Sequence, residues 1–207
     1  MSLALTGSSR VGIVADSLAI PFTAGAIPFQ YGFEPLLRAR YGSLALAGSA
    51  VRRLPFFYAD GAAGRSAFNI AATIGTVLAG MPKNLTHIIV QLGINDADAI
   101  RTGAGGENIS NCTTAATTIR DACAAIVGGP NLAWIGPWGS LAGIDATQIA
   151  QVDAAFSPLL AAISGTYITW SGVTNLGGAA IADGTHPTTI GAAALGTQTM
   201  LNLSVAA

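Results

Sequence analysis

Charged residues are scarce in this chain of 207 residues. Asp, Glu, Lys and Arg together make up 9% of it, Lys83 is the only lysine, and the net charge at neutral pH is -1. Proteins that bind nucleic acid depend on clustered basic side chains that neutralise phosphates, and the sequence contains no basic stripe. The composition therefore argues against a nucleic-acid partner.

Long hydrophobic runs are missing as well, although 51% of the residues are hydrophobic. A membrane-spanning helix needs about 18 or more consecutive apolar residues, and Gly, Thr, Asn, Pro and charged residues interrupt the apolar stretches. The opening residues MSLALTGSS lack the basic region that precedes the apolar part of a signal peptide. We expect one domain over residues 1–207 and no membrane span. Few lysines with many Thr, Ser, Asn and Ala favour a secreted or particle-surface protein.

Only two cysteines are present, Cys112 and Cys123. If both lie on one helix, the residues between them separate the thiols by roughly 16 Å, which is too far for a disulfide. No histidine adjoins either cysteine, and their spacing matches no zinc motif. We therefore expect two buried free thiols and no metal site.

The sequence does contain an alternation of strand-like and helix-like segments. Five runs with β-branched or aromatic residues have the length of strands: Val11–Ala15, Leu54–Ala59, His87–Leu92, Leu132–Ile135 and Tyr167–Trp170. Apolar residues at helical spacing predict helices over Gly32–Arg40, Ala67–Ala79, Ile109–Val127, Ala146–Ile163 and Thr188–Leu201. The Gly-rich segment 102–108 is expected to be a loop. This alternation predicts a parallel sheet covered on both faces, a three-layer α/β/α sandwich.

Polar residues of the types that carry out catalysis lie where the predicted strands end. In chain order they are Asp16 and Ser17, the glycines Gly61 and Gly64, then Asn95, and last Asp183 and His186. Ligands of open parallel sheets bind outside the carboxyl edge. Together these residues supply a hydroxyl nucleophile, an imidazole base, a carboxylate to orient it, and N–H donors for a developing oxyanion.

Each of these residues alone has a plainer interpretation. Asp16 and Ser17 are residue types that cap helices, the glycines are typical of turns, and Asn95 is typical of a turn or cap. The other histidine, His87, begins an apolar strand, where a structural role is expected. The combination at one predicted sheet edge favours catalysis over coincidence.

The order A-D-S-L, G-x-x-G-x-S, G-x-N-D and D-x-x-H resembles the four blocks of the SGNH hydrolase superfamily, also called GDSL esterases and lipases. The resemblance runs from residue 11 to about 196 and includes H-P-T-x-x-G after the histidine. It implies that Ser17 is the nucleophile and one oxyanion donor, with Gly64 and Asn95 as the others. It implies that His186 is the base and Asp183 its orienting acid. It also implies a flavodoxin-like fold with five parallel strands in the order 2-1-3-4-5.

One position departs from the family pattern. Ala15 stands where the family usually has the glycine before Asp16. An ordinary negative φ at this position would make the alanine cost little, whereas a positive φ would strain it by about 1 kcal/mol or more. Asp16 is expected to anchor the loops rather than to act as an acid or base.

These residues predict a serine esterase that forms an acyl-enzyme and needs no metal or cofactor. Trp138, after the fourth predicted strand, is expected to line the site and to bind a sugar face or an acyl group, with a half-buried packing aromatic as the alternative. The absence of long apolar lid segments favours short-chain esters, especially O-acetyl groups on carbohydrate, over triglycerides.

Two other classes of protein share such a fold. A non-catalytic carbohydrate-binding or structural module that retains the SGNH fold is the main alternative, because fold alone does not establish function. A flavodoxin-like nucleotide or flavin binder would need a Gly-rich phosphate loop at the first turn from strand to helix, and the sequence has none there.

Overall fold

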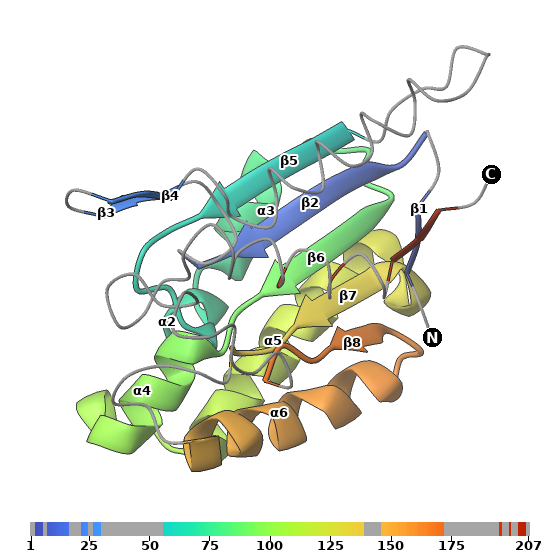
Figure 1. Cartoon of the computed structure of the whole chain (residues 1–207). Coiled ribbons are helices and arrows are strands. Elements are labelled where there is room, and N and C mark those ends of the chain that lie inside the picture. Colours follow the sequence, from blue (N-terminus) through green and yellow to red (C-terminus); the bar gives the residue numbers. More distant parts are fainter. Residues whose placement is uncertain are drawn as a thin grey trace.

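Figure 1 shows the arrangement of helices and strands in a computed structural model of the chain. The structure describes residues 3–5, 8–16, 22–24, 27–29, 56–138, 146–171, 195, 199 and 203–205. The strands are β1 Leu3–Leu5, β2 Arg10–Ala15, β3 Phe22–Ala24, β4 Ile27–Phe29, β5 Phe56–Gly61, β6 His87–Gln91, β7 Leu132–Ile135, β8 Thr166–Ile168 and β9 Leu203–Val205. The helices are α2 Ala67–Ala71, α3 Ile74–Gly80, α4 Ile94–Thr102, α5 Ile109–Val127 and α6 Ala146–Ala161, with short 3-10 turns η1 Ala104–Gly106 and η2 Gly129–Asn131.

The main sheet has five strands in the order β5-β2-β6-β7-β8, and all four neighbouring pairs are parallel. Numbered along the chain within this sheet, the order is 2-1-3-4-5, as the family resemblance implied. Figure 1 shows α3 and α5 behind the sheet and α6 beside its β8 edge. The expected α/β class, a five-stranded parallel sheet flanked by helices, is confirmed.

The register of the sheet brings the carboxyl ends of the strands into one row. Ala15 pairs with Gly61 on one side and with Gln91 on the other. Gln91 pairs in turn with Ile135, which pairs with Ile168. The residues that follow these five therefore leave the sheet at a common edge, where ligands of open parallel sheets bind.

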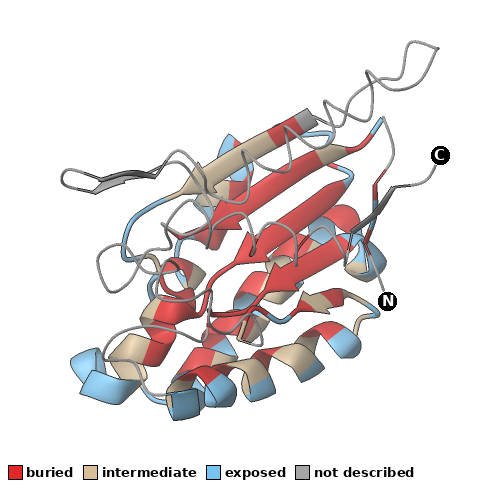
Figure 2. Cartoon of the chain, in the orientation of Figure 1, coloured by how far each residue is buried: buried red, intermediate tan, exposed pale blue. Residues whose placement is uncertain are grey.

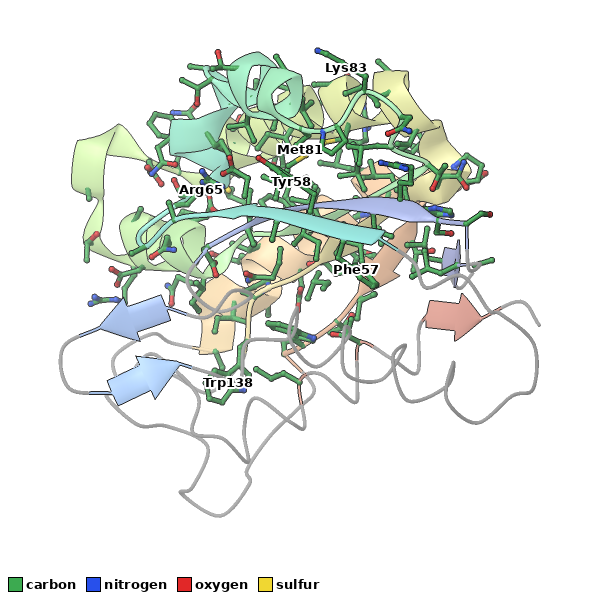
Figure 3. All side chains as sticks on the ribbon, turned by 90° about the horizontal axis from the view of Figure 1, so that it is seen from above. Phe57, Tyr58, Arg65, Met81, Lys83 and Trp138 are labelled. Carbon is green, nitrogen blue, oxygen red and sulfur yellow. The ribbon has the colours of Figure 1, made fainter. Side chains whose placement is uncertain are left out.

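The centre of the sheet is buried on both faces, as expected for parallel strands (Figure 2). All five residues of β6 and all four of β7 are buried. Side chains alternate across the outer strand β5: Tyr58 points toward Met81 on the helix side, and Phe57 points to the other side (Figure 3). The β-branched and aromatic composition of these runs is thus explained by packing on two sides.

The helices match the predictions to different degrees. Helix α5 has the predicted bounds, and α6 ends two residues before the predicted end. The helix predicted over residues 67–79 is divided into α2 and α3. The N–H and hydroxyl of Thr73 both donate to the Ile70 carbonyl, at 2.9 and 3.2 Å, and this tight turn ends α2.

Some structural elements were not expected. Helix α4 occupies residues that the sequence suggested as a turn followed by a loop, and η1 lies within the expected loop 102–108. Two small sheets, β1 with β9 in parallel and β3 with β4 antiparallel, lie outside the main sheet. The predicted helix over residues 32–40 lies outside the described residues, as does the one over 188–201 except for Leu195 and Thr199, which are helical.

Candidate active site

The chain leaves strand β2 through a buried, hydrogen-bonded carboxylate. Asp16 is fully buried, and its N–H donates to the Gln91 carbonyl at 3.2 Å. The Gln91 side-chain Nε2 donates to Asp16 Oδ2, also at 3.2 Å. Asp16 thus attaches the chain after β2 to the end of β6, in keeping with its expected anchoring role. Ser17, the expected nucleophile, lies outside the described residues.

Ala15 occupies the last position of β2 with strand backbone geometry. Within the described part of the chain, Ser164 is the non-glycine residue with positive φ, so Ala15 is not strained. Its methyl group is fully buried in the core. The alanine in place of the family's glycine therefore carries no backbone penalty.

Gly64 lies in an exposed turn beyond the end of β5. Its φ is +70°, and a Cβ added there would meet nothing within 4 Å, so the glycine is required by backbone conformation and not by space. The Gly64 carbonyl accepts a hydrogen bond from Asn69 Nδ2 at 3.2 Å. Its own N–H has no partner among the hydrogen bonds of the described residues. An exposed, unpaired N–H is what an oxyanion donor needs.

The turn after Gly64 is fixed by the first residues of α2. Ser66 Oγ accepts from the Asn69 N–H at 3.1 Å, and Asn69 Oδ1 accepts from the Ser66 N–H at 3.0 Å. This reciprocal pair is a capping box. The serine of the G-x-x-G-x-S motif thus has a structural explanation as a helix cap.

The side chain of Asp96, in helix α4, binds the first N–H groups of α2, and we call this contact the Asp96 clamp. The carboxylate is fully buried and accepts from the N–H of Ala67 at 2.9 Å and from the N–H of Phe68 at 3.2 Å. The Cys112 thiol donates to its Oδ1 at 3.3 Å. Asp96 therefore ties the start of α2, which follows the Gly64 turn, to α4 and α5.

Asn95 lies one residue before this clamp, in the first turn of α4. It is half-buried, and its Nδ2 donates to the Arg65 carbonyl at 2.9 Å. An amide NH2 group has two hydrogens, so one remains available to a substrate oxygen. The structure thus brings the Asn95 amide to Arg65, the residue after Gly64, and a shared oxyanion site for Gly64 and Asn95 stays a prediction.

Gly93 explains the first residue of the G-x-N-D motif. Its φ is +135°, and an added Cβ would lie 2.9 Å from Pro137 Cδ and 3.2 Å from Val152 Cγ1. Backbone conformation and space both require glycine here. This close packing sets the direction in which α4 leaves β6, and it therefore sets the position of Asn95.

Arg65 is a site residue to which sequence reasoning gave no role. Its Nη1 donates to the backbone carbonyls of Asp60 at 2.8 Å and Ala15 at 3.2 Å, and its Nη2 lies 2.6 Å from Asp60 Oδ1. Figure 3 places the side chain beside the carboxyl end of β5. The available signal was an arginine directly after the candidate oxyanion glycine in a chain with few charges.

Burial dominates the electrostatics beneath this site. Burial raises the pKa of Asp96, although its hydrogen bonds from Ala67, Phe68 and Cys112 act in the opposite direction. Burial, together with the nearby Asp96 carboxylate, raises the pKa of the Cys112 thiol far above its usual range. Burial and the Asp96 charge also raise the pKa of Glu107. The Cys112 thiol therefore stays protonated and serves as a hydrogen-bond donor.

Several further expectations can be compared with the structure. Cys112 and Cys123 are both free and buried, as predicted. His87 begins β6 at the opposite end from Gln91, and burial lowers its pKa, in accord with a structural role. Asp183 and His186 lie outside the described residues. No group of three or more metal-ligating side chains occurs in the described part of the chain, and no helix there is long and apolar enough to span a bilayer.

Trp138 follows β7 at the same edge, but its side chain is only 1% exposed. Figure 3 shows it on the Phe57 side of the sheet. Such burial is typical of a packing aromatic, which was the alternative interpretation of this residue. Contact between Trp138 and a substrate stays a prediction.

Comparison with solved structures places this fold among known hydrolases. An acetylxylan esterase from Geobacillus stearothermophilus, Axe2, solved as a catalytic mutant, superposes with a TM-score of 0.74 at 14% identity, covering 96% of this chain and 95% of that one. The psychrotrophic esterase EstA from Pseudoalteromonas sp. gives 0.68 at 14%, covering 94% and 96%. The lipase/acylhydrolase from Enterococcus faecalis gives 0.69 at 16%, covering 91% and 92%.

These similarities extend over nearly the whole chain, and they define its fold as that of the SGNH, or GDSL, esterases and lipases. No family model matches the sequence, and no curated protein matches it. At identities of this size the structural matches establish fold and leave activity to be argued from the site.

Proposed function

We propose that this protein is a serine esterase that hydrolyses short-chain carboxylic esters. Ser17 acts as nucleophile, His186 as general base and Asp183 as the acid that orients the imidazole. The backbone N–H groups of Ser17 and Gly64 and the side chain of Asn95 form the oxyanion hole. The observation that supports this proposal is the 2.9 Å hydrogen bond from Asn95 Nδ2 to the carbonyl of Arg65, the residue that follows Gly64.

The reaction proceeds by acyl transfer. His186 removes the proton from the Ser17 hydroxyl as Oγ attacks the ester carbonyl carbon, and the carbonyl oxygen becomes an oxyanion. Collapse of this tetrahedral species breaks the bond to the alcohol, which leaves with the proton from His186. His186 then removes a proton from water, whose oxygen attacks the carbonyl carbon of the acyl-enzyme. Collapse of this second tetrahedral species breaks the bond to Ser17 Oγ, which takes the proton back from His186, and the acid is released. The donors matter because they stabilise negative charge that exists only in the tetrahedral states.

The preferred substrate in this proposal is an acetyl ester of a carbohydrate. Support comes from the match to an acetylxylan esterase over nearly the full length of both chains. That coverage also supports one hydrolase domain spanning residues 1–207. No cofactor takes part in the proposed steps. Trp138 contacts the substrate only if its buried ring becomes accessible when a substrate binds.

The first experiment compares hydrolysis of p-nitrophenyl acetate with that of p-nitrophenyl octanoate, using Ser17→Ala as the control. We expect turnover that favours acetate and is lost in the variant, with no change in the unfolding temperature. Turnover by the Ser17→Ala variant at the wild-type rate would exclude Ser17 as the nucleophile. A serine-reactive phosphonate gives a second readout, since EstA has been solved in a form inhibited by monoethylphosphonate. Absence of both turnover and labelling would favour the non-catalytic module.

Asp183→Asn tests the role of the orienting acid in the same assay, while the proposed base, His186, is kept. The asparagine no longer holds a negative charge beside the imidazole, so we expect slow but measurable turnover. Wild-type turnover in this variant would show that Asp183 is a capping residue instead.

A further inference from the structure

Arg65 makes hydrogen bonds to three elements at the candidate site: the end of β2, the end of β5 and the start of α4. It follows Gly64 directly, and its side chain is 14% exposed. Its Nη1 donates to two carbonyls from different strands, those of Asp60 in β5 and Ala15 in β2. These contacts go beyond an exposed ion pair, which contributes little by itself, because the guanidinium also joins the backbones of two strands.

The contact with Ala15 connects Arg65 to the nucleophile's segment. Ala15 is the last residue of β2 and precedes Ser17 by two positions. The guanidinium lies 3.2 Å from its carbonyl oxygen, and this bond spans 50 residues of sequence. A second bond nearby runs from the Ala62 N–H to the same carbonyl, also at 3.2 Å. The Ala15 carbonyl at the end of β2 therefore accepts hydrogen bonds from residues on both sides of Gly64, Ala62 and Arg65.

The backbone of Arg65 connects the same residue to the third segment. Its carbonyl accepts the 2.9 Å hydrogen bond from Asn95 Nδ2. Through side chain and backbone together, Arg65 contacts the segment before Ser17, the turn that contains Gly64 and the amide of Asn95. These are the three sources of oxyanion donors in the proposed function.

We propose that Arg65 is a positioning residue of the esterase: it fixes the distance between the Ser17 segment and the Gly64 and Asn95 donors. This inference rests on the proposed function. The planar guanidinium suits the task because one group can donate to two carbonyls and pair with the Asp60 carboxylate at 2.6 Å. A lysine ammonium at the same position has a different shape and cannot span all three acceptors in one plane.

The consequence should appear in catalysis more than in substrate binding. Replacing Arg65 removes its hydrogen bonds and lets the oxyanion donors shift relative to the attacked carbonyl. A displacement of about 1 Å can cost about 100-fold in rate. The oxyanion exists only after attack, so looser donors weaken the transition state and leave ground-state binding nearly unchanged. A residue that served stability alone would lower the unfolding temperature without this selective loss of kcat.

Arg120 provides a matched control. Its side chain is also 14% exposed, pairs with the Asp121 carboxylate at 2.5 Å and donates to a backbone carbonyl, that of Leu159, at 3.4 Å. It lies on α5 and contacts the last turns of α6, which lead to the amino end of β8. Both arginines thus resemble each other in burial and partners, but only Arg65 adjoins the candidate site.

The experiment measures kcat and KM for p-nitrophenyl acetate in wild type, Arg65→Lys, Arg65→Met and Arg120→Met, at a temperature where each variant is folded. We expect kcat to fall by about 100-fold in Arg65→Met with KM within about twofold, and Arg65→Lys to recover little of the loss. Arg120→Met should keep the wild-type kcat. Equal kcat in wild type and both Arg65 variants would overturn the proposal.

Two further measurements distinguish loss of the positioning role from misfolding and from failure of the proposed esterase function. In Arg65→Ala, free guanidinium at concentrations far below those that unfold proteins should raise kcat, which a purely structural defect would not show. The rate of phosphonate labelling of Ser17 should fall in parallel with kcat. A wild-type protein that is neither active nor labelled would overturn the proposed function, whereas labelling of wild type and Arg65 variants at one rate would overturn only the role of Arg65.

Discussion

Asp96 holds the start of helix α2 from the start of helix α4: its Oδ2 lies 2.9 Å from the backbone nitrogen of Ala67. The first N–H groups of a helix have no partner inside the helix, and here a residue 29 positions away supplies one. A negative charge at this end also interacts favourably with the helix dipole. The relationship explains why an acidic residue is fully buried in a chain with few charges.

The first prediction concerns Asp96→Asn. An amide offers one oxygen in place of two and directs an NH2 group toward backbone donors, so we expect about 1 to 3 kcal/mol lower stability against denaturant at neutral pH. Asp98→Asn, a substitution of a half-buried residue of the same helix that pairs with Arg101, should change stability by less than about 0.5 kcal/mol. Equal effects of the two substitutions would contradict the clamp.

The difference in stability between wild type and Asp96→Asn should change with pH in a definite direction. Burial raises the pKa of folded Asp96 above its ordinary value of 3.8, so the folded state binds the proton more tightly than the unfolded state. Asp96 therefore contributes most to stability below 3.8, and this contribution is lost as the pH rises through the folded pKa. The stability of wild type minus that of Asp96→Asn should fall as the pH is raised from about 4. A difference that grows with pH would show that the hydrogen bonds outweigh burial.

A second prediction concerns the glycine before Asn95. Gly93→Ala introduces a Cβ 2.9 Å from Pro137 Cδ at a φ of +135°, and we expect a loss of about 2 to 4 kcal/mol in the free energy of unfolding. Gly75→Ala is the matched control because Gly75 lies in helix α3 with nothing within 4 Å of an added Cβ. That substitution should stabilise the protein by about 0.5 to 1 kcal/mol. Thermal melts of the two variants test both signs.

The third prediction concerns thiol reactivity. Burial raises the pKa of Cys123 to about 12 and that of Cys112 still further, so neither forms the reactive thiolate near neutral pH. A thiol reagent such as Ellman's should label neither cysteine in the native protein and both in denaturant. Rapid labelling of Cys112 in the native protein would show that the Asp96 clamp opens.

Much of the fold was predictable because parallel strands bury both faces and leave a local pattern. The runs that became β7 and α5 were predicted with the observed bounds. Helix α4 was missed because Asn95 and Asp96 look like turn residues, and its buried side chains are only Ile94, Asp96 and Ala97. Its packing against α6 decides its structure, and no local pattern reports that contact.

The candidate site was predictable only in part. Gly64 and Asn95 could be singled out because they stand in motifs at strand ends, and the register confirms that these ends share one edge. The roles of Arg65 and Asp96 depend on bonds to residues 50 and 29 positions away, and those distances are invisible in a sequence. Ser17, Asp183 and His186 stay predictions, since they lie outside the described residues.

The last prediction concerns Ala15, which differs from the family's usual glycine. Because Ala15 has strand geometry and a fully buried methyl group, Ala15→Gly relieves no strain and removes core packing. Glycine also adds freedom to the unfolded chain, so stability should fall by about 1 kcal/mol or somewhat more. The carbonyl that accepts the Arg65 bond is retained, and kcat for p-nitrophenyl acetate should therefore stay within about twofold of wild type. A gain in both stability and kcat would show that the alanine strains the turn to Ser17 after all.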